Sequence, residues 1–155
     1  MYDVEDVLNE LLAVGAVPSG RFIGCTVAEI DHLMKDQGVS ALPSSYRRFL
    51  ERAGRDAGPI FVGSEISYPG LLGIKRASEN LLTENFADWA LKQSDFVIQM
   101  HQGYQIFWID TAVAEPEVWM YTEGDTGPTA FLVEFIDYLK AASPLERHCR
   151  EIRSL

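Results

Sequence analysis

The sequence contains only two cysteines and lacks the residue spacings of disulfide-rich and metal-binding proteins. Cys25 and Cys149 are far apart and form no CxxC pair, so they can neither build a disulfide framework nor supply a zinc cluster. His32, His101 and His148 have no second histidine at the spacing of a metal site. We therefore expect a reducing compartment and no metal-binding residues.

The chain also lacks a basic N-terminus and a long hydrophobic run. Its first six residues include Asp3, Glu5 and Asp6, whereas a secretory signal needs lysine or arginine there. The apolar run over residues 11–17 is far too short to span a bilayer. We therefore expect a cytoplasmic protein.

No motif of a catalytic or nucleotide-binding site is complete. Residues 58–63 have the glycine spacing of a phosphate loop, but Ser64 stands where the phosphate-binding lysine must be. The glycine pairs at 70–73 and 124–127 are short of a dinucleotide fingerprint and are typical of turns. Carboxylates are so numerous that no pair stands out as an acid and base. We expect no catalytic residues, no cofactor and no enzymatic activity; a small enzyme with an unrecognised site is the alternative.

Acidic residues are what the chain has in excess. It carries 23 aspartates and glutamates against 13 lysines and arginines, which gives a formal charge of -10 at pH 7. Such a field repels phosphate backbones and anionic lipid and attracts basic proteins. We therefore predict a basic protein partner and no direct binding to nucleic acid or membrane. Solubility alone is the alternative reason for the charge.

Several segments carry apolar residues at helical spacing. Thr26 and Glu29 form a capping box that begins a helix, and Gly38 ends it. Pro43 suits the first turn of another helix, which Gly54 ends. The predicted helices cover residues 4–14, 27–37, 43–53, 74–86 and 131–139. In the second helix, we expect the inward-facing residues to be Val27, Ile30, Leu33 and Met34.

Shorter alternating segments predict strands over residues 59–62, 95–101, 104–110 and 118–122. Gln102 and Gly103 make a plausible two-residue hairpin turn, with glycine supplying positive φ. That turn pairs His101 with Tyr104, Gln99 with Ile106 and Val97 with Trp108. One face of the hairpin then holds Val97, Gln99, His101, Tyr104, Ile106 and Trp108. The core face holds Phe96, Ile98, Met100, Phe107 and Ile109.

This order of elements predicts the α+β class: N-terminal helices, a central antiparallel β-meander and a closing C-terminal helix. With 155 residues and 47% apolar residues, the chain is long enough to bury a core without disulfides or metal. We expect one domain over residues 1–155.

Several of these segments, taken in order, resemble the SUKH superfamily of Smi/Knr-type proteins. They are the helix that opens with Leu42-Pro43 (42–50), the hairpin segments 96–98, 102–104 and 106–109, the strand segment 116–121 and the apolar segment 131–139. The resemblance is strongest over residues 41–142. It implies a bacterial immunity protein that binds and neutralises a cognate toxin, often a nuclease. It also implies a second possibility, a non-catalytic scaffold or regulatory domain like the eukaryotic relatives.

Two groups of residues are candidates for partner binding. The mixed hairpin face contributes Gln99, His101, Tyr104 and Trp108, because tryptophan and tyrosine most often anchor interfaces. The loops around the third predicted strand contribute Glu115, Glu117, Glu123 and Asp125, which can steer a basic partner. The alternative is that a helix, such as the N-terminal one, covers the hairpin face. In that case Trp108 belongs to the core.

Overall fold

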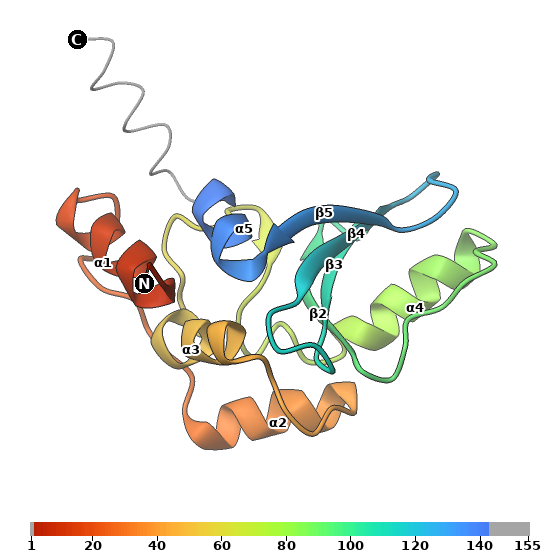
Figure 1. Ribbon diagram of the computed structural model, residues 1–155, viewed down its shortest axis with the longest axis horizontal. Coiled ribbons are helices and arrows are strands. Elements are labelled where there is room, and N and C mark those ends of the chain that lie inside the picture. Colours follow the sequence, from red (N-terminus) through yellow and green to blue (C-terminus); the bar gives the residue numbers. More distant parts are fainter. Residues whose placement is uncertain (1, 143–155) are drawn as a thin grey trace, which may run out of the picture.

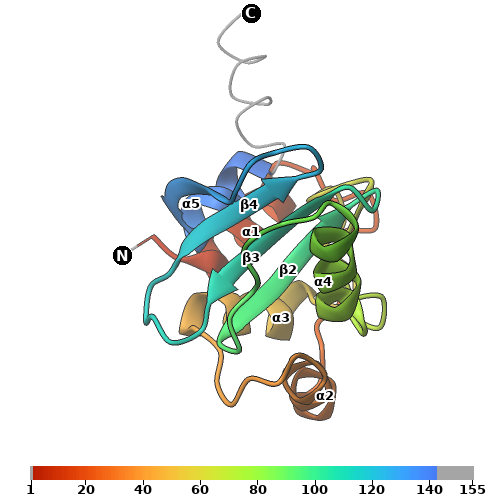
Figure 2. The ribbon, with the colours of Figure 1, turned by 90° about the vertical axis from the view of Figure 1, so that its right-hand side faces the viewer.

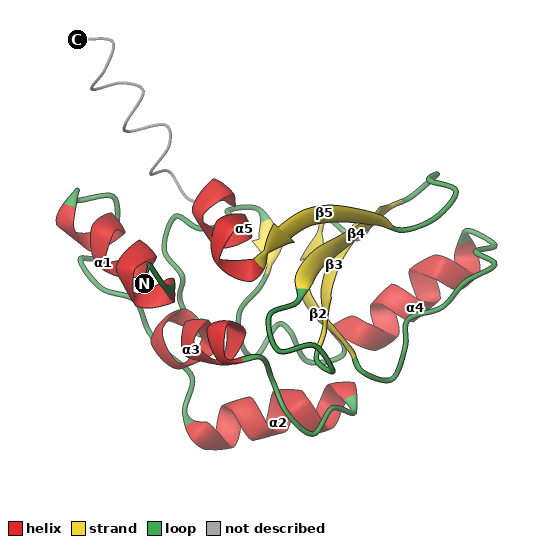
Figure 3. Cartoon of the chain, viewed as in Figure 1, coloured by secondary structure: helices red, strands yellow, loops and turns green. Residues whose placement is uncertain are grey.

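The computed structural model describes residues 2–142, except for the side chains of residues 131–133. Within this range it confirms the α+β class, with five helices and a five-stranded sheet (Figures 1 and 3). The helices are α1 (Val4–Ala13), α2 (Val27–Gln37), α3 (Ser44–Ala53), α4 (Ile74–Glu84) and α5 (Phe135–Ala142). The strands are β1 (Ser64–Glu65), β2 (Asp95–His101), β3 (Gln105–Asp110), β4 (Glu117–Thr122) and β5 (Thr129–Glu134).

The sheet is the predicted antiparallel meander, because its strands pair in the order β1-β2-β3-β4-β5. Helices cover both of its faces. Figure 2 shows α4 in front of the sheet, with α1, α3 and α5 behind it. Behind the sheet, the ring of Tyr46 in α3 packs against Phe96 of β2 at 5.4 Å between centroids. We call this side the inner face, and the side beneath α4, which carries Val97 and Trp108, the α4 face.

Local signals set the helix ends as predicted. The side chain of Thr26 accepts a hydrogen bond from the backbone of Glu29, and Glu29 accepts one in return. Gly38 ends α2 in the left-handed conformation, with φ at 74°. Ile30 is buried as expected, but Val27 is wrong as an inward-facing residue because it is 66% exposed. Val27 is the first residue of α2, and the buried residues of this helix are Ile30, Leu33 and Gln37.

Two predicted elements are wrong. Residues 59–62 form turns in place of a strand, because Gly58, Phe61 and Gly63 all have positive φ and bend the chain. The strand that follows, β1, has only two residues and pairs with Met100 and His101. The predicted helix over 131–139 is half strand: β5 continues through Glu134, and α5 begins at Phe135.

The predicted register of the β2–β3 hairpin is correct at the end far from the turn and wrong near the turn. Val97 pairs with Trp108 as predicted. Nearer the turn, His101 pairs with Gln105, because the turn contains one residue more than expected. A bulge at Ile98 absorbs the difference. Since side chains alternate along a strand, the extra residue reverses the sides of the β2 residues between the bulge and the turn, whereas β3 keeps the predicted sides.

The outer edge of β2 is closed by side chains where β1 does not reach. The amide of Gln37 donates to the carbonyl of Val97 at 2.9 Å and accepts from its N–H at 2.7 Å. The ammonium of Lys75 lies 2.6 Å from the carbonyl of Asp95 and 3.1 Å from that of Lys92. These bonds satisfy an edge that would otherwise be open to pairing. They also fix the start of β2, which borders the site described next.

Candidate binding groove

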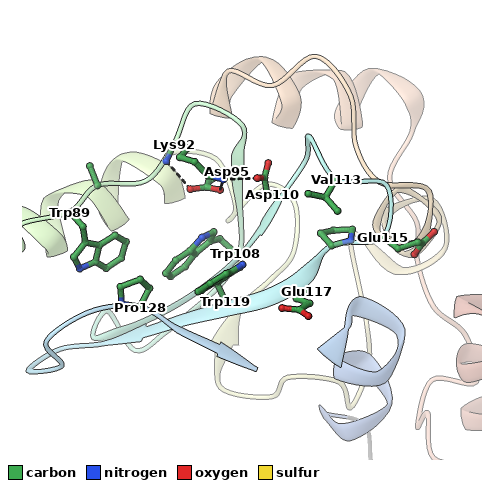
Figure 4. Close-up of a pocket in the computed structure, with 12 residues that line it drawn as sticks. Trp89, Lys92, Asp95, Trp108, Asp110, Val113, Glu115, Glu117, Trp119 and Pro128 are labelled. Carbon is green, nitrogen blue, oxygen red and sulfur yellow. Dashed lines mark hydrogen bonds and ion pairs between the residues drawn. The ribbon is translucent and has the colours of Figure 1, made fainter. Parts of the chain in front are cut away.

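A groove of about 550 Å³ opens on the α4 face of the sheet (Figure 4). The segment that joins α4 to β2 forms one side, and strands β3 and β4 with their loops form the rest. The chain has three tryptophans, and all of them, Trp89, Trp108 and Trp119, line this groove. Tryptophan is the side chain that most often anchors a protein interface.

The sheet register and one stacking contact hold the three indoles together. Trp108 of β3 and Trp119 of β4 are direct cross-strand partners. Trp89, from the α4–β2 segment, stacks on Trp108 with 5.5 Å between centroids and meets Tyr121 edge-on at the same distance. Trp108 is only 4% exposed, whereas Trp89 and Trp119 are half-buried. Trp108 is therefore the floor, and the other two indoles offer accessible surface.

Two prolines and a valine extend the apolar lining. Pro116 and Val113 come from the β3–β4 loop, and Pro128 comes from the β4–β5 loop. Figure 4 shows Pro128 beside Trp89 and Trp119. Proline fixes its own φ, so these loops lose little freedom when a ligand binds. The groove is thus largely preformed.

A lysine and two aspartates lie at the end of the groove near the start of β2. Lys92 donates to Asp110 at 2.5 Å, which lowers the pKa of Asp110 and raises that of Lys92. The backbone N–H of Lys92 donates to one oxygen of Asp95 at 2.7 Å. Burial raises the pKa of Asp95, because that carboxyl is only 3% exposed.

Two polar atoms of the groove are buried without a hydrogen-bond partner among the described residues. One is Oδ1 of Asp95, whose nearest cation is the ammonium of Lys92 at 3.9 Å. The other is the indole Nε1 of Trp89. Buried polar groups are normally paired, and leaving one unpaired costs about 1–3 kcal/mol. An ordered water or a ligand atom at these positions would pair them.

Two further carboxylates come from the β3–β4 loop and the start of β4. Glu115 and Glu117 line the groove, and Glu117 lies directly across the strand pair from Glu134. Like charges in that arrangement are destabilising. No ion pair within residues 2–142 involves any of these three glutamates.

The groove brings together three of the predicted partner-binding residues, namely Trp108, Glu115 and Glu117. Glu123 and Asp125 are exposed on the β4–β5 loop but do not line it. Tyr104 is 38% exposed and also lies outside the groove.

The predicted common face of the hairpin was wrong. The bulge at Ile98 sends Gln99 and His101 to the inner face, away from Trp108. There Gln99 accepts a hydrogen bond from the hydroxyl of Tyr138 in α5 and donates to Ser64 at 2.9 Å. The Nδ1 atom of His101 lies 2.8 Å from the Ser64 hydroxyl. Whether Gln99 and His101 contact a partner stays a prediction.

The expected alternative cover, the N-terminal helix, is not what lies over Trp108. Helix α1 packs against α3 and α5, on the other side of the sheet. Trp89 covers Trp108 instead. Sequence reasoning missed Trp89, because it lies in an irregular segment. Trp119 could have been found, since the predicted third strand places it beside Trp108.

Neither a metal site nor a membrane span is found in the part of the chain that the structure describes. No group of three or more His, Cys, Asp or Glu residues is placed to hold a metal ion there. None of the described helices is both long and apolar enough to cross a membrane. With its aromatic floor and charged rim, the groove has the features of a binding site.

Comparison with known proteins identifies the family. The model of the SMI1 / KNR4 family (SUKH-1) matches residues 24–141, which include every residue of the groove. A search of curated proteins gives no match. Because the family match covers well over half of the sequence, the chain belongs to the SMI1 / KNR4 family (SUKH-1).

Proposed function

We propose that this protein is a cytoplasmic immunity protein that binds and neutralises a basic protein toxin through the tryptophan groove. The observation that carries the proposal is the meeting of all three tryptophans with unpaired carboxylates in one open groove. Toxin immunity is the role that the family match favours. The protein acts by occupying the toxin, so it needs no catalytic residue.

The aromatic composition of the groove supports a protein ligand. Interface hot spots are rich in tryptophan and lie in well-packed pockets that exclude water. Trp89 and Trp119 offer half-buried surface around the buried Trp108. A segment of a partner protein can cover that surface and gain the free energy of removing it from water.

The charge of the chain supports a basic partner. A formal charge of -10 attracts a positively charged protein over long range and speeds encounter. Enzymes that act on nucleic acid carry positive surfaces for phosphate. An acidic inhibitor that docks on such a surface also keeps the substrate away from it. This is the reason to place a nuclease-type toxin first among the candidate partners.

The test uses the protein and the product of a toxin-like gene encoded immediately upstream, purified separately. We expect the protein to bind the toxin and to abolish its activity at equimolar concentration. Binding without neutralisation would favour the scaffold or regulatory role. Absence of binding would contradict the immunity role.

Two aromatic substitutions locate the contact. Trp119→Ala removes a half-buried indole of the groove, and Tyr104→Ala removes a partly exposed ring outside it. We expect Trp119→Ala to weaken toxin binding about tenfold or more, as hot-spot truncations do, and Tyr104→Ala to leave it nearly unchanged. Equal effects of the two substitutions on binding would place the contact elsewhere.

A further inference from the structure

We propose that the groove is built for an arginine side chain on a basic segment of the partner. In this arrangement the guanidinium lies against the accessible indoles and pairs with the carboxylates of the rim. This inference deepens the proposed function and rests on its claim that the partner is a protein that enters the groove.

The balance of charge in the groove favours a cation. Its lining includes one lysine, Lys92, against four carboxylates, those of Asp95, Asp110, Glu115 and Glu117. Lys92 is already paired with Asp110. An uncharged apolar ligand would remove the exposed carboxylates of Glu115 and Glu117 from water without giving them a partner, which is costly. A cationic ligand gives them one.

The register of β4 and β5 supplies a second, independent argument. Glu117 and Glu134 lie directly opposite each other on adjacent strands, and no ion pair within the described residues relieves them. The sheet therefore holds two like charges together before any ligand arrives. A cation beside Glu117 turns this repulsion into attraction, so part of its binding free energy is already stored in the free protein.

Asp95 supplies a third argument at the other end of the groove. Its carboxyl is buried, and its Oδ1 has no hydrogen-bond donor among residues 2–142. Figure 4 shows this carboxyl between Lys92 and Trp108. Because this oxygen is buried, Asp95 attracts a second basic residue of the same segment through its charge and not through a direct hydrogen bond.

The aromatic walls favour arginine over lysine. The planar guanidinium stacks on indole faces and forks onto a carboxylate, whereas the ammonium of lysine is a compact and strongly hydrated charge. Glu117 and Trp119 are two residues apart on β4, and both line the groove. An arginine that pairs with Glu117 can therefore lie against Trp119.

The test is a fluorescence titration of the full-length protein with short synthetic peptides. One peptide alternates glycine with arginine, a second replaces arginine with lysine, and a third replaces it with citrulline, a neutral group of the same shape. Because every tryptophan of the chain lines the groove, binding there changes the intrinsic emission. We expect the arginine peptide to bind several-fold more tightly than the lysine peptide. Its affinity should exceed that of the citrulline peptide about tenfold or more.

A matched pair of variants separates the groove from overall charge. Glu117→Gln and Glu84→Gln each remove one negative charge from an exposed glutamate, but only Glu117 lines the groove. We expect Glu117→Gln to weaken binding of the arginine peptide about tenfold and Glu84→Gln to weaken it less than about twofold, since exposed charges away from a contact are screened by salt. Melting temperatures of both variants should match or exceed that of the parent protein.

Three outcomes overturn the inference: no change in emission, equal binding of arginine and citrulline peptides, or equal effects of the two glutamate substitutions. The same variants are then tested on the toxin. Full neutralisation by Glu117→Gln would defeat the inference and leave the immunity role standing. Specific binding of the arginine peptide by a protein that neutralises no toxin would defeat the immunity role and leave the inference standing.

Discussion

Replacing Trp108 with alanine tests whether this side chain belongs to the core or to an open binding face. Trp108 is 4% exposed, stacks on Trp89 and faces Val97 and Trp119 across its two strand pairs. Alanine at this position removes the floor of the groove and leaves a cavity beneath Trp89. The direct effect should therefore be a loss of stability.

The size of that loss follows from the surroundings of the indole. Truncating a fully buried aromatic side chain costs about 3–5 kcal/mol, which includes the lost ring stacking. The groove lies above Trp108, so water or the ring of Trp89 can partly fill the space. We therefore expect the lower part of that range, about 3 kcal/mol. For a chain of 155 residues, this lowers the melting temperature by about 6–12 °C.

Urea unfolding and thermal melts measure this loss, with Trp119→Ala as the control. Trp119 is half-buried, and its truncation should cost only about 1–2 kcal/mol because less apolar area leaves the interior. A free-energy loss below about 1 kcal/mol for Trp108→Ala would refute its assignment to the core. Equal losses of unfolding free energy in the two variants would refute the distinction between Trp108 as the buried floor of the groove and Trp119 as a partly exposed side chain.

Three further predictions concern stability at the edge of the sheet, stability at acid pH and the rate of association with the toxin. Gln37→Leu should cost about 2–4 kcal/mol in urea unfolding, because it leaves the buried N–H and carbonyl of Val97 without partners; an unchanged midpoint would show that the edge does not need them. A hydrogen bond from Arg55 lowers the pKa of Glu29 from 4.5 to about 2, so its stabilisation is present above about pH 4.5 and is lost as the pH falls through 2. Melting temperatures of Glu29→Gln should therefore fall less than those of the parent between these pH values, and parallel curves would contradict the pairing. Stopped-flow association with the toxin should slow steeply as salt rises while dissociation changes less, and a salt-independent rate of association would exclude steering by the acidic field.

Helix ends were predictable from sequence because their chemistry is local. The capping box of Thr26 and Glu29, the left-handed glycine at Gly38 and the proline before α3 each act within a few residues. The buried residues of α3, such as Tyr46 and Leu50, lie on one face of that single helix. None of these features depends on distant parts of the chain.

The prediction of a helix over residues 131–139 failed for the opposite reason, because the structure of this segment depends on distant contacts. Its apolar residues suit a helix and a strand equally, and aromatic and β-branched residues also favour strands. Pairing with β4, as between Trp119 and Ala130, decides the matter. That contact depends on the fold of the whole sheet, and the spacing of apolar residues does not reveal it.

The bulge at Ile98 had the largest effect on the candidate site. It was invisible in the sequence, because no glycine or proline marks it and the continuous apolar runs over 96–98 and 106–109 do not fix a register. The consequence is that Gln99 and His101 leave the face of Trp108. One inserted residue thus divided a predicted surface into two.

Part of the groove was predictable and part was not. Trp108, Glu115 and Glu117 were predicted from residue type and from their place on or beside strands. Trp89 reaches the groove because the irregular segment after α4 folds back over the sheet. Asp95 is a candidate only because the fold buries it, and sequence reasoning treated it as one of many carboxylates.

The groove gathers arrangements that a sequence selected for stability alone would avoid. Asp95 is buried with a raised pKa and an unpaired oxygen, and the indole N–H of Trp89 has no acceptor in the described region. Glu117 opposes Glu134 across two strands. Each arrangement could be relieved by one conservative change, such as Asp95→Asn or Glu134→Gln. Stability lost at one site is common where function requires it, and two basic residues of one partner segment would offset the charge of Asp95 at one end of the groove and of Glu117 at the other.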